Sequence, residues 1–212
     1  MNKKVLGIVI PYYKNSEEAE QAFKVLMEHI SKQVTDDMIL FVWEDGQLSN
    51  WLQRYNKENI IITGSTINQG VAFARNQGIN YLINKVKYIL FIDSDDWVED
   101  NYLKVMHEYC ADETHEVIES TFYVNKAPSQ FDANLIRSGA AGSALKTDII
   151  GDIRFKENLE IAEDTNFMND VINLSRHRKK HANTKYIYQY GKNPNSLIMR
   201  YNRKEITGKR GN

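Results

Sequence analysis

Residues 88–97, Tyr-Ile-Leu-Phe-Ile-Asp-Ser-Asp-Asp-Trp, decide which fold the rest of the chain can adopt. The first five residues are apolar without alternation, which is typical of a strand buried on both faces in a helix-covered parallel sheet. Asp93, Asp95 and Asp96 follow, and three neighbouring carboxylates repel one another unless a cation or hydrogen-bond donors hold them. Open α/β sheets bind ligands at the carboxyl ends of their strands, and carboxylate oxygens suit Mg²⁺ or Mn²⁺ with a phosphorylated ligand. The alternative is a solvated turn that caps the next helix.

The sequence before this stretch alternates between strand and helix patterns. Three strands are predicted, at residues 5–10, 39–43 and 60–62. Helices are predicted after a cap at Asn15 or Ser16 and at residues 71–84. Pro11 ends the first predicted strand, so Pro11, Tyr12 and Tyr13 are expected on a loop at its carboxyl end. This order of elements indicates an α/β fold, with a mainly parallel, Rossmann-like central sheet and helices on both faces.

Length and composition indicate one globular domain. A chain of 212 residues can bury one sizeable core and a small C-terminal extension, and 42% hydrophobic with 26% charged residues is ordinary for a soluble protein. The single cysteine, Cys110, is expected to be a small buried side chain. No apolar run approaches the roughly 18 residues of a membrane span, and the N-terminus lacks a signal-peptide core. A cytoplasmic location is therefore expected.

The charge is distributed unevenly along the chain. Residues 1–170 carry a net charge of -11, whereas residues 171–212 contain 11 Lys and Arg against one acid and carry +10. A basic end on an acidic body predicts a polyanionic partner, which could be a pyrophosphate, an anionic phospholipid surface or a nucleic acid. A solvated tail would account for the last basic residues, but it accounts less well for the cluster at residues 176–181.

Several polar side chains are predicted to meet where strands end. Tyr13, Asp45, Arg75 and residues 93–96 all lie near strand ends or the helix between them. An aromatic ring can stack on a base, a carboxylate can accept from a base N–H, and an arginine can bind a base carbonyl or a phosphate. Together these groups suit a nucleoside diphosphate. Taken singly, each has an ordinary alternative as a loop aromatic, a turn residue or a surface helix residue.

The order of these motifs resembles that of family 2 glycosyltransferases with the GT-A fold. The resemblance implies an inverting, nonprocessive enzyme. The resemblance covers roughly residues 5–200 and depends on the following segments: Pro11-Tyr12-Tyr13, Glu44-Asp45-Gly46, residues 68–78, residues 91–97, Gly142-Ser143-Ala144, Phe155 and residues 163–167. It implies a nucleotide-sugar-binding half at residues 1–98, an acceptor half at residues 99–200 and a basic tail at residues 201–212.

The resemblance also implies roles for individual residues of the donor site. Tyr13, Asp45 and Arg75 would hold the nucleotide base, commonly uracil, and Asp93 would reach the ribose. Asp95, with Asp93, would coordinate Mn²⁺ or Mg²⁺ between the phosphates. The remaining expected donor contacts are Pro11, Glu44 and Ser94. Glu44 departs from the family, which usually has Asp there, and the extra methylene displaces the carboxylate, so that donor preference can differ.

A second acidic pair, Glu163 and Asp164, precedes an apolar helical stripe. The ordinary interpretation is that both acids complement the helix dipole. The resemblance instead places the pair beneath the acceptor, with Asp164 as the general base. An acceptor hydroxyl must lose its proton as it attacks the anomeric carbon, and direct attack with one base inverts that carbon.

These observations predict a metal-dependent glycosyltransferase that moves a sugar from a nucleotide-diphosphate sugar, expected to be a UDP-sugar, to a glycan or lipid-linked acceptor. Peripheral contact between residues 171–212 and the anionic inner face of the membrane is expected, and nucleic acid is the less favoured partner because no recognition helix stands out. Two alternatives remain open. One is a glycosyltransferase acting on modified DNA or another polyanion, and the other is an inactive nucleotide-sugar-binding scaffold.

Overall fold

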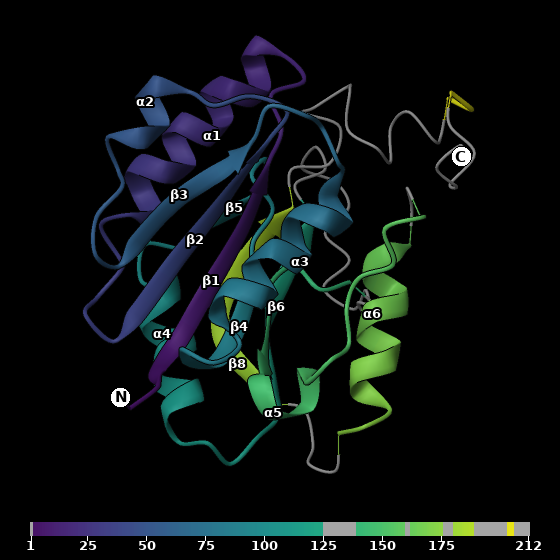
Figure 1. Ribbon diagram of the computed structural model, residues 1–212. Coiled ribbons are helices and arrows are strands. Elements are labelled where there is room, and N and C mark those ends of the chain that lie inside the picture. The colour runs from purple at the N-terminus through teal and green to yellow at the C-terminus, as the bar shows by residue number, and fades with distance from the viewer. Residues whose placement is uncertain (1, 125–138, 160–161, 176–179, 189–202, 206–212) are drawn as a thin grey trace.

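The computed structural model describes residues 2–124, 139–159, 162–175, 180–188 and 203–205 of the chain (Figure 1). The strands are β1 (Lys4–Tyr12), β2 (Met38–Asp45), β3 (Ile60–Ser65), β4 (Val86–Phe91), β5 (Trp97–Val98), β6 (Val117–Val124), β7 (Ser143–Lys146) and β8 (Lys180–Tyr188). The helices are α1 (Glu17–Ile30), α2 (Asn50–Gln53), α3 (Val71–Leu82), α4 (Tyr102–Ala111), α5 (Thr147–Ile150) and α6 (Glu163–Ile172).

The strands form one eight-stranded sheet in the order β3-β2-β1-β4-β7-β6-β8-β5. β3, β2, β1 and β4 are mutually parallel, so their carboxyl ends lie at one edge. Beyond β4, β7 runs antiparallel to both β4 and β6, while β6 and β8 are parallel and the short β5 is antiparallel to β8. The prediction of a mainly parallel α/β sheet is therefore confirmed.

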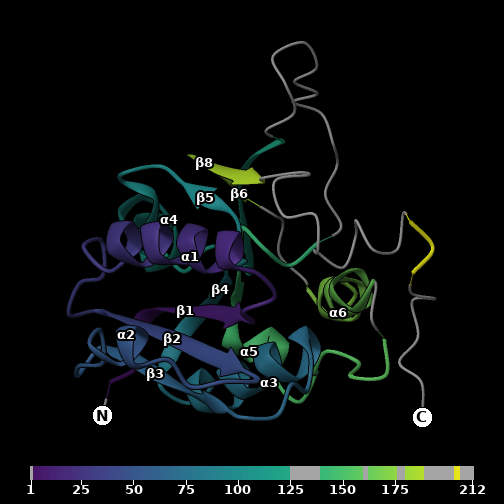
Figure 2. The same cartoon turned by 90° about the horizontal axis from the view of Figure 1, so that it is seen from above.

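The two faces of the sheet are covered by different helices, as the view from above shows (Figure 2). α1 and α4 lie over one face, and α3 and α5 lie over the other. Successive side chains of a strand point to opposite faces, so β1 contributes to two cores. Leu6, Ile8 and Ile10 belong to the core under α1 and α4, whereas Val9 belongs to the core under α3.

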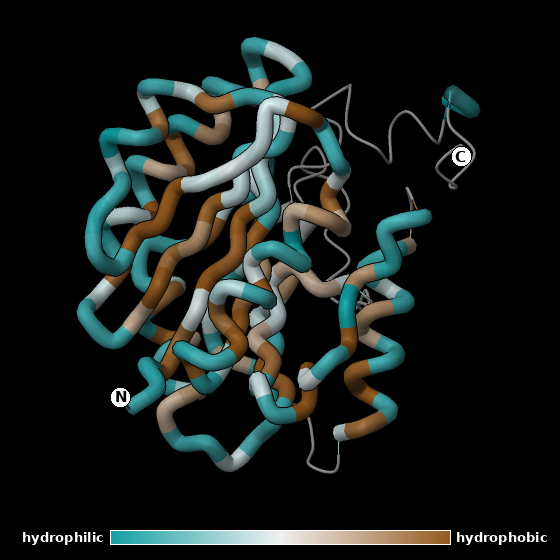
Figure 3. The backbone as a smooth tube through the Cα atoms, in the orientation of Figure 1, coloured by the Kyte–Doolittle hydropathy of each residue, from teal (hydrophilic) through white to brown (hydrophobic). Residues whose placement is uncertain are grey.

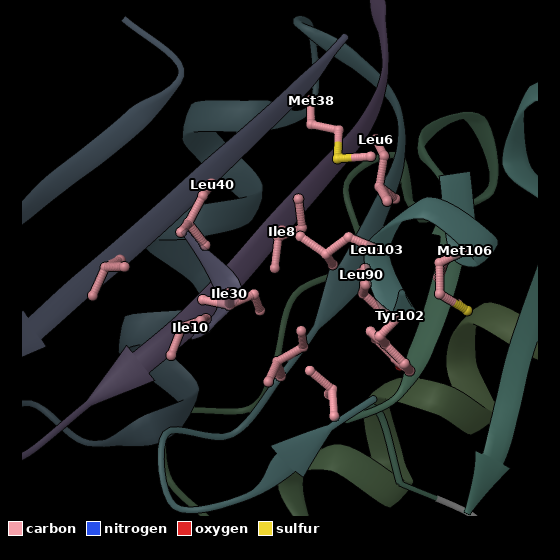
Figure 4. Close-up of a cluster of buried hydrophobic side chains, with 14 of the residues drawn as sticks. Leu6, Ile8, Ile10, Ile30, Met38, Leu40, Leu90, Tyr102, Leu103 and Met106 are labelled. Carbon is pink, nitrogen blue, oxygen red and sulfur yellow. The ribbon is translucent and has the colours of Figure 1, made fainter. Parts of the chain in front are cut away.

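The core on the α1 side consists of aliphatic, aromatic and methionine side chains from strands and helices (Figure 4). In that view Ile8 and Ile10 of β1 lie beside Ile30 of α1, and Leu103 of α4 lies beside Leu90 of β4. Residue hydropathy agrees with this core, because the residues of the central strands are hydrophobic while those of the connecting loops are largely hydrophilic (Figure 3). Burial of this apolar surface holds the strand ends in fixed relative positions.

β1 extends further than the sequence predicts. It continues through Pro11 to Tyr12, and Pro11 is paired in register with Trp43 of β2. The pairing of β1 with β4 ends earlier, at Val9 and Phe91, so the missing N–H of Pro11 costs no ladder hydrogen bond. The expectation that Pro11 and Tyr12 lie on a loop is therefore wrong, although Tyr13 does lie beyond the strand.

Ser16 is the N-cap of α1 and accepts a hydrogen bond from the Ala19 N–H at 3.1 Å, as one of the two expected caps. α3 ends at Leu82, two residues before the predicted boundary. In the part of the chain that the structure describes, no helix is both long and apolar enough to cross a membrane. The basic cluster at residues 176–179 and all of the expected tail except residues 203–205 lie outside the described residues.

Candidate functional site

The predicted donor residues come from the edge where β1, β2 and β4 end. Asp45, the last residue of β2, is buried and accepts hydrogen bonds from the backbone N–H groups of Gln69 and Gly70, at 2.9 and 2.7 Å. Gly70 is the N-cap of α3 and has no side chain with which to cap the helix. The Asp45 carboxylate therefore fixes the backbone that leads into α3 to the end of β2.

Glu44, its neighbour in β2, is fully buried. Its carboxylate accepts from the backbone N–H of Ser49 at 2.8 Å and from the Ser49 hydroxyl, and so it closes the loop that leads into α2. The longer side chain noted in the sequence is directed to this loop. Its assignment as a donor contact stays a prediction, and the burial of Glu44 does not favour direct contact with a ligand.

Tyr13 lies on the surface at the same edge, with 48% of its area exposed. Its ring packs against Gly46, where an added Cβ would lie 3.1 Å from the Tyr13 ring. Gly46 has a φ of 99°, which only glycine adopts readily, so the turn after β2 needs glycine for both its backbone and its contact. An exposed ring with one side supported by a turn is available for stacking on a planar ligand.

The acidic stretch after β4 forms a turn, in which the N–H of Asp96 donates to the carbonyl of Asp93. Tyr186 of β8 fixes both ends of this turn. Its hydroxyl donates to the buried Asp96 carboxylate at 2.6 Å and accepts from the Asp93 N–H at 3.0 Å. The turn does not cap α4, whose N-cap is Asn101, so the alternative interpretation of these acids as a helix cap is wrong. Ser94 and Asp95 lie at its two central positions, partly exposed.

Arg75 is the residue at which the two acidic stretches meet. Its Nη2 atom donates to Asp93 at 2.7 Å and its Nη1 atom donates to Glu163 at 2.8 Å. The side chain has 4% of its area exposed, and the guanidinium lies over the ring of Phe155. Burial lowers the pKa of Arg75, but the carboxylates of Asp93, Glu163 and the neighbouring Asp164 outweigh burial and raise it overall, so the guanidinium is charged.

Glu163 and Asp164 form the first turn of α6, and the structure gives them different surroundings. Glu163 is buried and paired with Arg75, and burial is the main cause that raises the pKa of its carboxyl, against the opposing charge of Arg75. Asp164 is partly exposed and accepts from the N–H of Thr165 at 2.7 Å. Of the two acids, Asp164 is the one whose position leaves it accessible to an acceptor.

Three residues of this region, Asn76, Phe155 and Tyr186, were given no individual role from the sequence, although the first two lie in segments that carry the family resemblance. Asn76 donates to the Phe155 carbonyl at 3.0 Å and accepts from the Phe155 N–H at 2.8 Å, and so it ties α3 to the segment before α6. Phe155 stacks on Phe167 of α6 with ring centroids 3.9 Å apart. A buried asparagine on the apolar side of a helix was the available signal for Asn76, whereas nothing near Tyr186 in the sequence indicates its contact with the acidic turn.

The acidic turn offers few carboxylates to a divalent cation. Among the described residues, no group of three His, Cys, Asp or Glu side chains is arranged to hold an ion. Mg²⁺ in enzymes that bind phosphates is commonly held by one or two carboxylates together with substrate oxygens and water. The turn suits this second arrangement through Asp95. Asp93, the other predicted ligand, is 27% exposed at its side chain and gives one carboxylate oxygen to Arg75.

Comparison with known families gives one match that covers most of the chain. The model described as "Glycosyl transferase family 2" matches residues 7–174. These residues include every strand from β1 to β7 and both acidic stretches, apart from the first residues of β1.

Two bacterial relatives align with the chain at low identity. The "Minor teichoic acid biosynthesis protein GgaA" of Bacillus subtilis (strain 168) is 24% identical over 232 residues, covering 96% of this chain and 51% of the relative. "Glycosyltransferase GlyG" of Streptococcus pneumoniae serotype 4 (strain ATCC BAA-334 / TIGR4) is 23% identical over 126 residues, covering 56% of this chain and 39% of the relative. The chain therefore spans about half, or less, of the length of these relatives.

Solved structures of S. aureus TarS share the fold. A structure of TarS residues 1–349 in complex with UDP-GlcNAc superposes with a TM-score of 0.70 and 19% identity, covering 88% of this chain and 59% of TarS 1–349. The complex of the same fragment with UDP gives a TM-score of 0.71. At this identity the likeness concerns the arrangement of strands and helices.

Proposed function

This chain belongs to glycosyl transferase family 2, and we propose that it moves a sugar from a nucleoside diphosphate sugar to a hydroxyl group of a glycan or lipid-linked acceptor. It is a glycosyltransferase by family, so the proposal concerns its substrates and the roles of its residues. The observation that carries the proposal is that Arg75 joins Asp93, on the strand edge expected to bind the donor, to Glu163, beside the expected acceptor base.

A uridine diphosphate sugar is the donor that the comparisons favour. TarS, which shares the fold, has been solved with UDP and with UDP-GlcNAc. In this chain Tyr13 offers an exposed ring for the base, and Asp95 lies on the turn where the diphosphate would be bound. Asp45 would support the donor site indirectly, because its carboxylate holds the start of α3 in place.

In the proposed reaction Asp164 takes the proton from the acceptor hydroxyl. The acceptor oxygen forms a bond with the anomeric carbon while the bond from that carbon to the diphosphate breaks, and the diphosphate leaves with the electron pair. A single displacement of this kind inverts the anomeric centre and needs no covalent enzyme intermediate. Glu163 does not compete with Asp164 for the proton, since its carboxylate is engaged by Arg75.

The departing diphosphate needs positive charge beside it. Mn²⁺ or Mg²⁺, when bound, would neutralise charge that develops on the leaving group. Asp95 would be the principal protein ligand of that ion, and Asp93 would contribute to the extent that its pairing with Arg75 allows. The protein's own contribution is to hold the acidic turn rigid through Tyr186.

The acceptor is proposed to be a hydroxyl of a cell-surface polymer or of its lipid-linked precursor. One relative, GgaA, is named for teichoic acid biosynthesis, and the net charge of +10 at residues 171–212 suits an anionic polymer or an anionic membrane that carries the acceptor. The argument for this end of the chain comes from its charge, because residues 176–179, 189–202 and 206–212 lie outside the described residues.

A thermal-shift titration tests the donor. The protein is heated with UDP-GlcNAc, UDP-glucose, UDP-galactose or GDP-mannose, with and without Mn²⁺. The correct donor should raise the melting temperature, because a ligand at about 100 times its Kd stabilises the folded state by roughly 2.7 kcal/mol. The rate of UDP release is then measured with and without a teichoic acid-type acceptor.

The Asp95→Asn variant is the matched control for the donor titration. It should keep the fold but lose the part of the shift that depends on Mn²⁺. If a nucleotide sugar raises the melting temperature but none is cleaved or transferred, the chain is the inactive nucleotide-sugar-binding scaffold considered from the sequence. If none raises it, the proposed donor class is wrong. If binding and transfer occur only with DNA present, the DNA-modifying alternative replaces the proposed acceptor.

A further inference from the structure

We propose that Arg75 is a positioning residue, which holds the donor-side acid Asp93 and the acceptor-side acid Glu163 at a fixed separation and does not itself bind the nucleotide. This inference depends on the proposed function, because it names the residue that aligns the two substrate stations. It replaces the role that the family resemblance implies for Arg75, which is contact with the base.

The burial of Arg75 argues against contact with a nucleotide base. The side chain is 4% exposed, and each terminal nitrogen already donates to a carboxylate, at 2.7 Å to Asp93 and at 2.8 Å to Glu163. The remaining nitrogen, Nε, is buried and has no hydrogen-bond partner. With 4% of the side chain exposed, a base could reach this guanidinium only if the side chains that bury it moved apart.

The geometry of the contacts explains why this position holds an arginine. The guanidinium is a rigid planar fork, so its two terminal nitrogens fix the directions of two acids at once. Lysine has a single ammonium group on a flexible stem and cannot fix two carboxylates in the same way. The ring of Phe155 supports the guanidinium plane from one side, with the central carbon 5.3 Å from the ring centroid.

The next residue of α3 strengthens the same connection. Asn76 holds the backbone of Phe155 through two hydrogen bonds, and Phe155 stacks on Phe167 of α6. Arg75 and Asn76 therefore hold the segment that leads to α6 at two points, one at Phe155 and the other at Glu163. Because Asp164 follows Glu163 directly, the position of the proposed base depends on this connection.

The test compares Arg75→Lys and Arg75→Gln with the wild type in steady-state transfer and in UDP binding. The positioning role predicts that kcat for transfer falls about 100-fold in both variants, as for a displacement of about 1 Å at a reacting centre. UDP affinity should change less than about threefold, and discrimination between UDP and CDP should be unchanged. Arg154→Lys is the matched control, since Arg154 is partly exposed and contacts Asn80 and the Gly151 carbonyl, away from both acids.

Two kinetic results would overturn the inference. If both variants lose UDP affinity and accept CDP as well as UDP while kcat is kept, Arg75 contacts the base as the resemblance implies. If Arg75→Lys keeps wild-type kcat and affinity, a fixed bridge between the acids is not needed. Asn76→Ala separates general loosening from positioning, because it removes the Phe155 contacts without touching either acid; it should lower the melting temperature with a smaller loss of kcat than Arg75→Gln.

A stability measurement on protein without substrate distinguishes failure of this inference from failure of the proposed function. Arg75→Lys and Glu163→Gln are combined in a double-mutant cycle, and the shifts in melting temperature are compared. A double variant that loses less than the sum of the single variants supports the bridge even if no donor is cleaved. Additive shifts would overturn the bridge, whatever the enzyme's activity.

Discussion

The proposed donor half and the proposed acceptor half hold their candidate functional acids in different ways. Asp45 is held by backbone N–H groups of Gln69 and Gly70, which belong to the same parallel half of the sheet. Glu163, in contrast, is held by Arg75, a side chain 88 residues earlier in the sequence. The proposed donor edge is therefore assembled by its own loops, whereas Glu163, of the proposed acceptor half, takes its position from helix α3 of the proposed donor half.

The N-termini of α1 and α6 differ in a similar way, since one is held by a local contact and the other by distant contacts. α1 begins with Ser16, whose hydroxyl caps the helix, whereas α6 begins after Ala162, which has a φ of 64° and makes no side-chain cap. A non-glycine residue with a left-handed backbone is strained, and this strain is retained only when surrounding contacts require the conformation. The start of α6 is thus held by contacts made elsewhere, among them the ion pair of Glu163.

The largest effect is expected from Asp95→Asn in the donor half. This nearly isosteric change removes a charged oxygen ligand, so turnover should fall by roughly 10³–10⁴-fold while the melting temperature stays the same. Initial rates with Mn²⁺ and with EDTA measure it. Asp100→Asn is the control, because its side chain is fully exposed five residues further on. Unchanged turnover in Asp95→Asn, together with no effect of EDTA, would remove the metal from the donor half.

Asp164→Asn examines the acceptor half separately from the donor half. Loss of the general base should lower transfer by roughly 10²–10⁴-fold, whereas the Kd for the nucleotide sugar should stay the same. Binding is measured by calorimetry and transfer by UDP release. Asp170→Asn, at an exposed position of the same helix, should behave like the wild type. An equal loss of binding and rate would place Asp164 in the donor site and abolish the division between the halves.

Gly78→Ala examines the packing of α3, which carries Arg75, against β1. An added Cβ would lie 2.5 Å from a methyl group of Val9, and overpacking of this kind costs about 1–3 kcal/mol. Alanine recovers up to about 1 kcal/mol through its helix propensity, so a net loss of about 1 kcal/mol is expected in urea denaturation. Gln77→Ala, on the same helix but partly exposed, is the comparison. A Gly78→Ala protein more stable than the wild type would mean that α3 is not tightly seated.

The smallest effect is expected from two Ala→Gly substitutions, which should change the stability of the protein in opposite directions. Ala162→Gly should stabilise the protein by up to about 1 kcal/mol, because glycine adopts the left-handed backbone without strain. Ala22→Gly, at an exposed position within α1, should destabilise it by about 1 kcal/mol. Chemical denaturation measures both. If Ala162→Gly also destabilises, the left-handed start of α6 is not a strained feature.

Features that depend on neighbouring residues were predictable from the sequence. The apolar run and acids of residues 88–97 correctly predicted a buried strand with acids at its carboxyl end, and Ser16 was correctly among the expected caps. The extension of β1 through Pro11 was not, since it depends on where the pairing with β4 stops. The pairing of Arg75 with Glu163 and the contact of Tyr186 with Asp96 join residues 88 and 90 positions apart, and no local pattern records such contacts.

The contact of Tyr186 with the acidic turn has a consequence for the order in which the protein matures during synthesis. The ribosome releases the turn after β4 long before it releases β8, so the hydroxyl that holds Asp93 and Asp96 arrives last. A nascent chain that has completed its parallel strands still lacks this support. Donor binding is therefore expected to appear late in translation, and chains stopped before Tyr186 should accumulate with a folded amino-terminal sheet but a loose acidic turn.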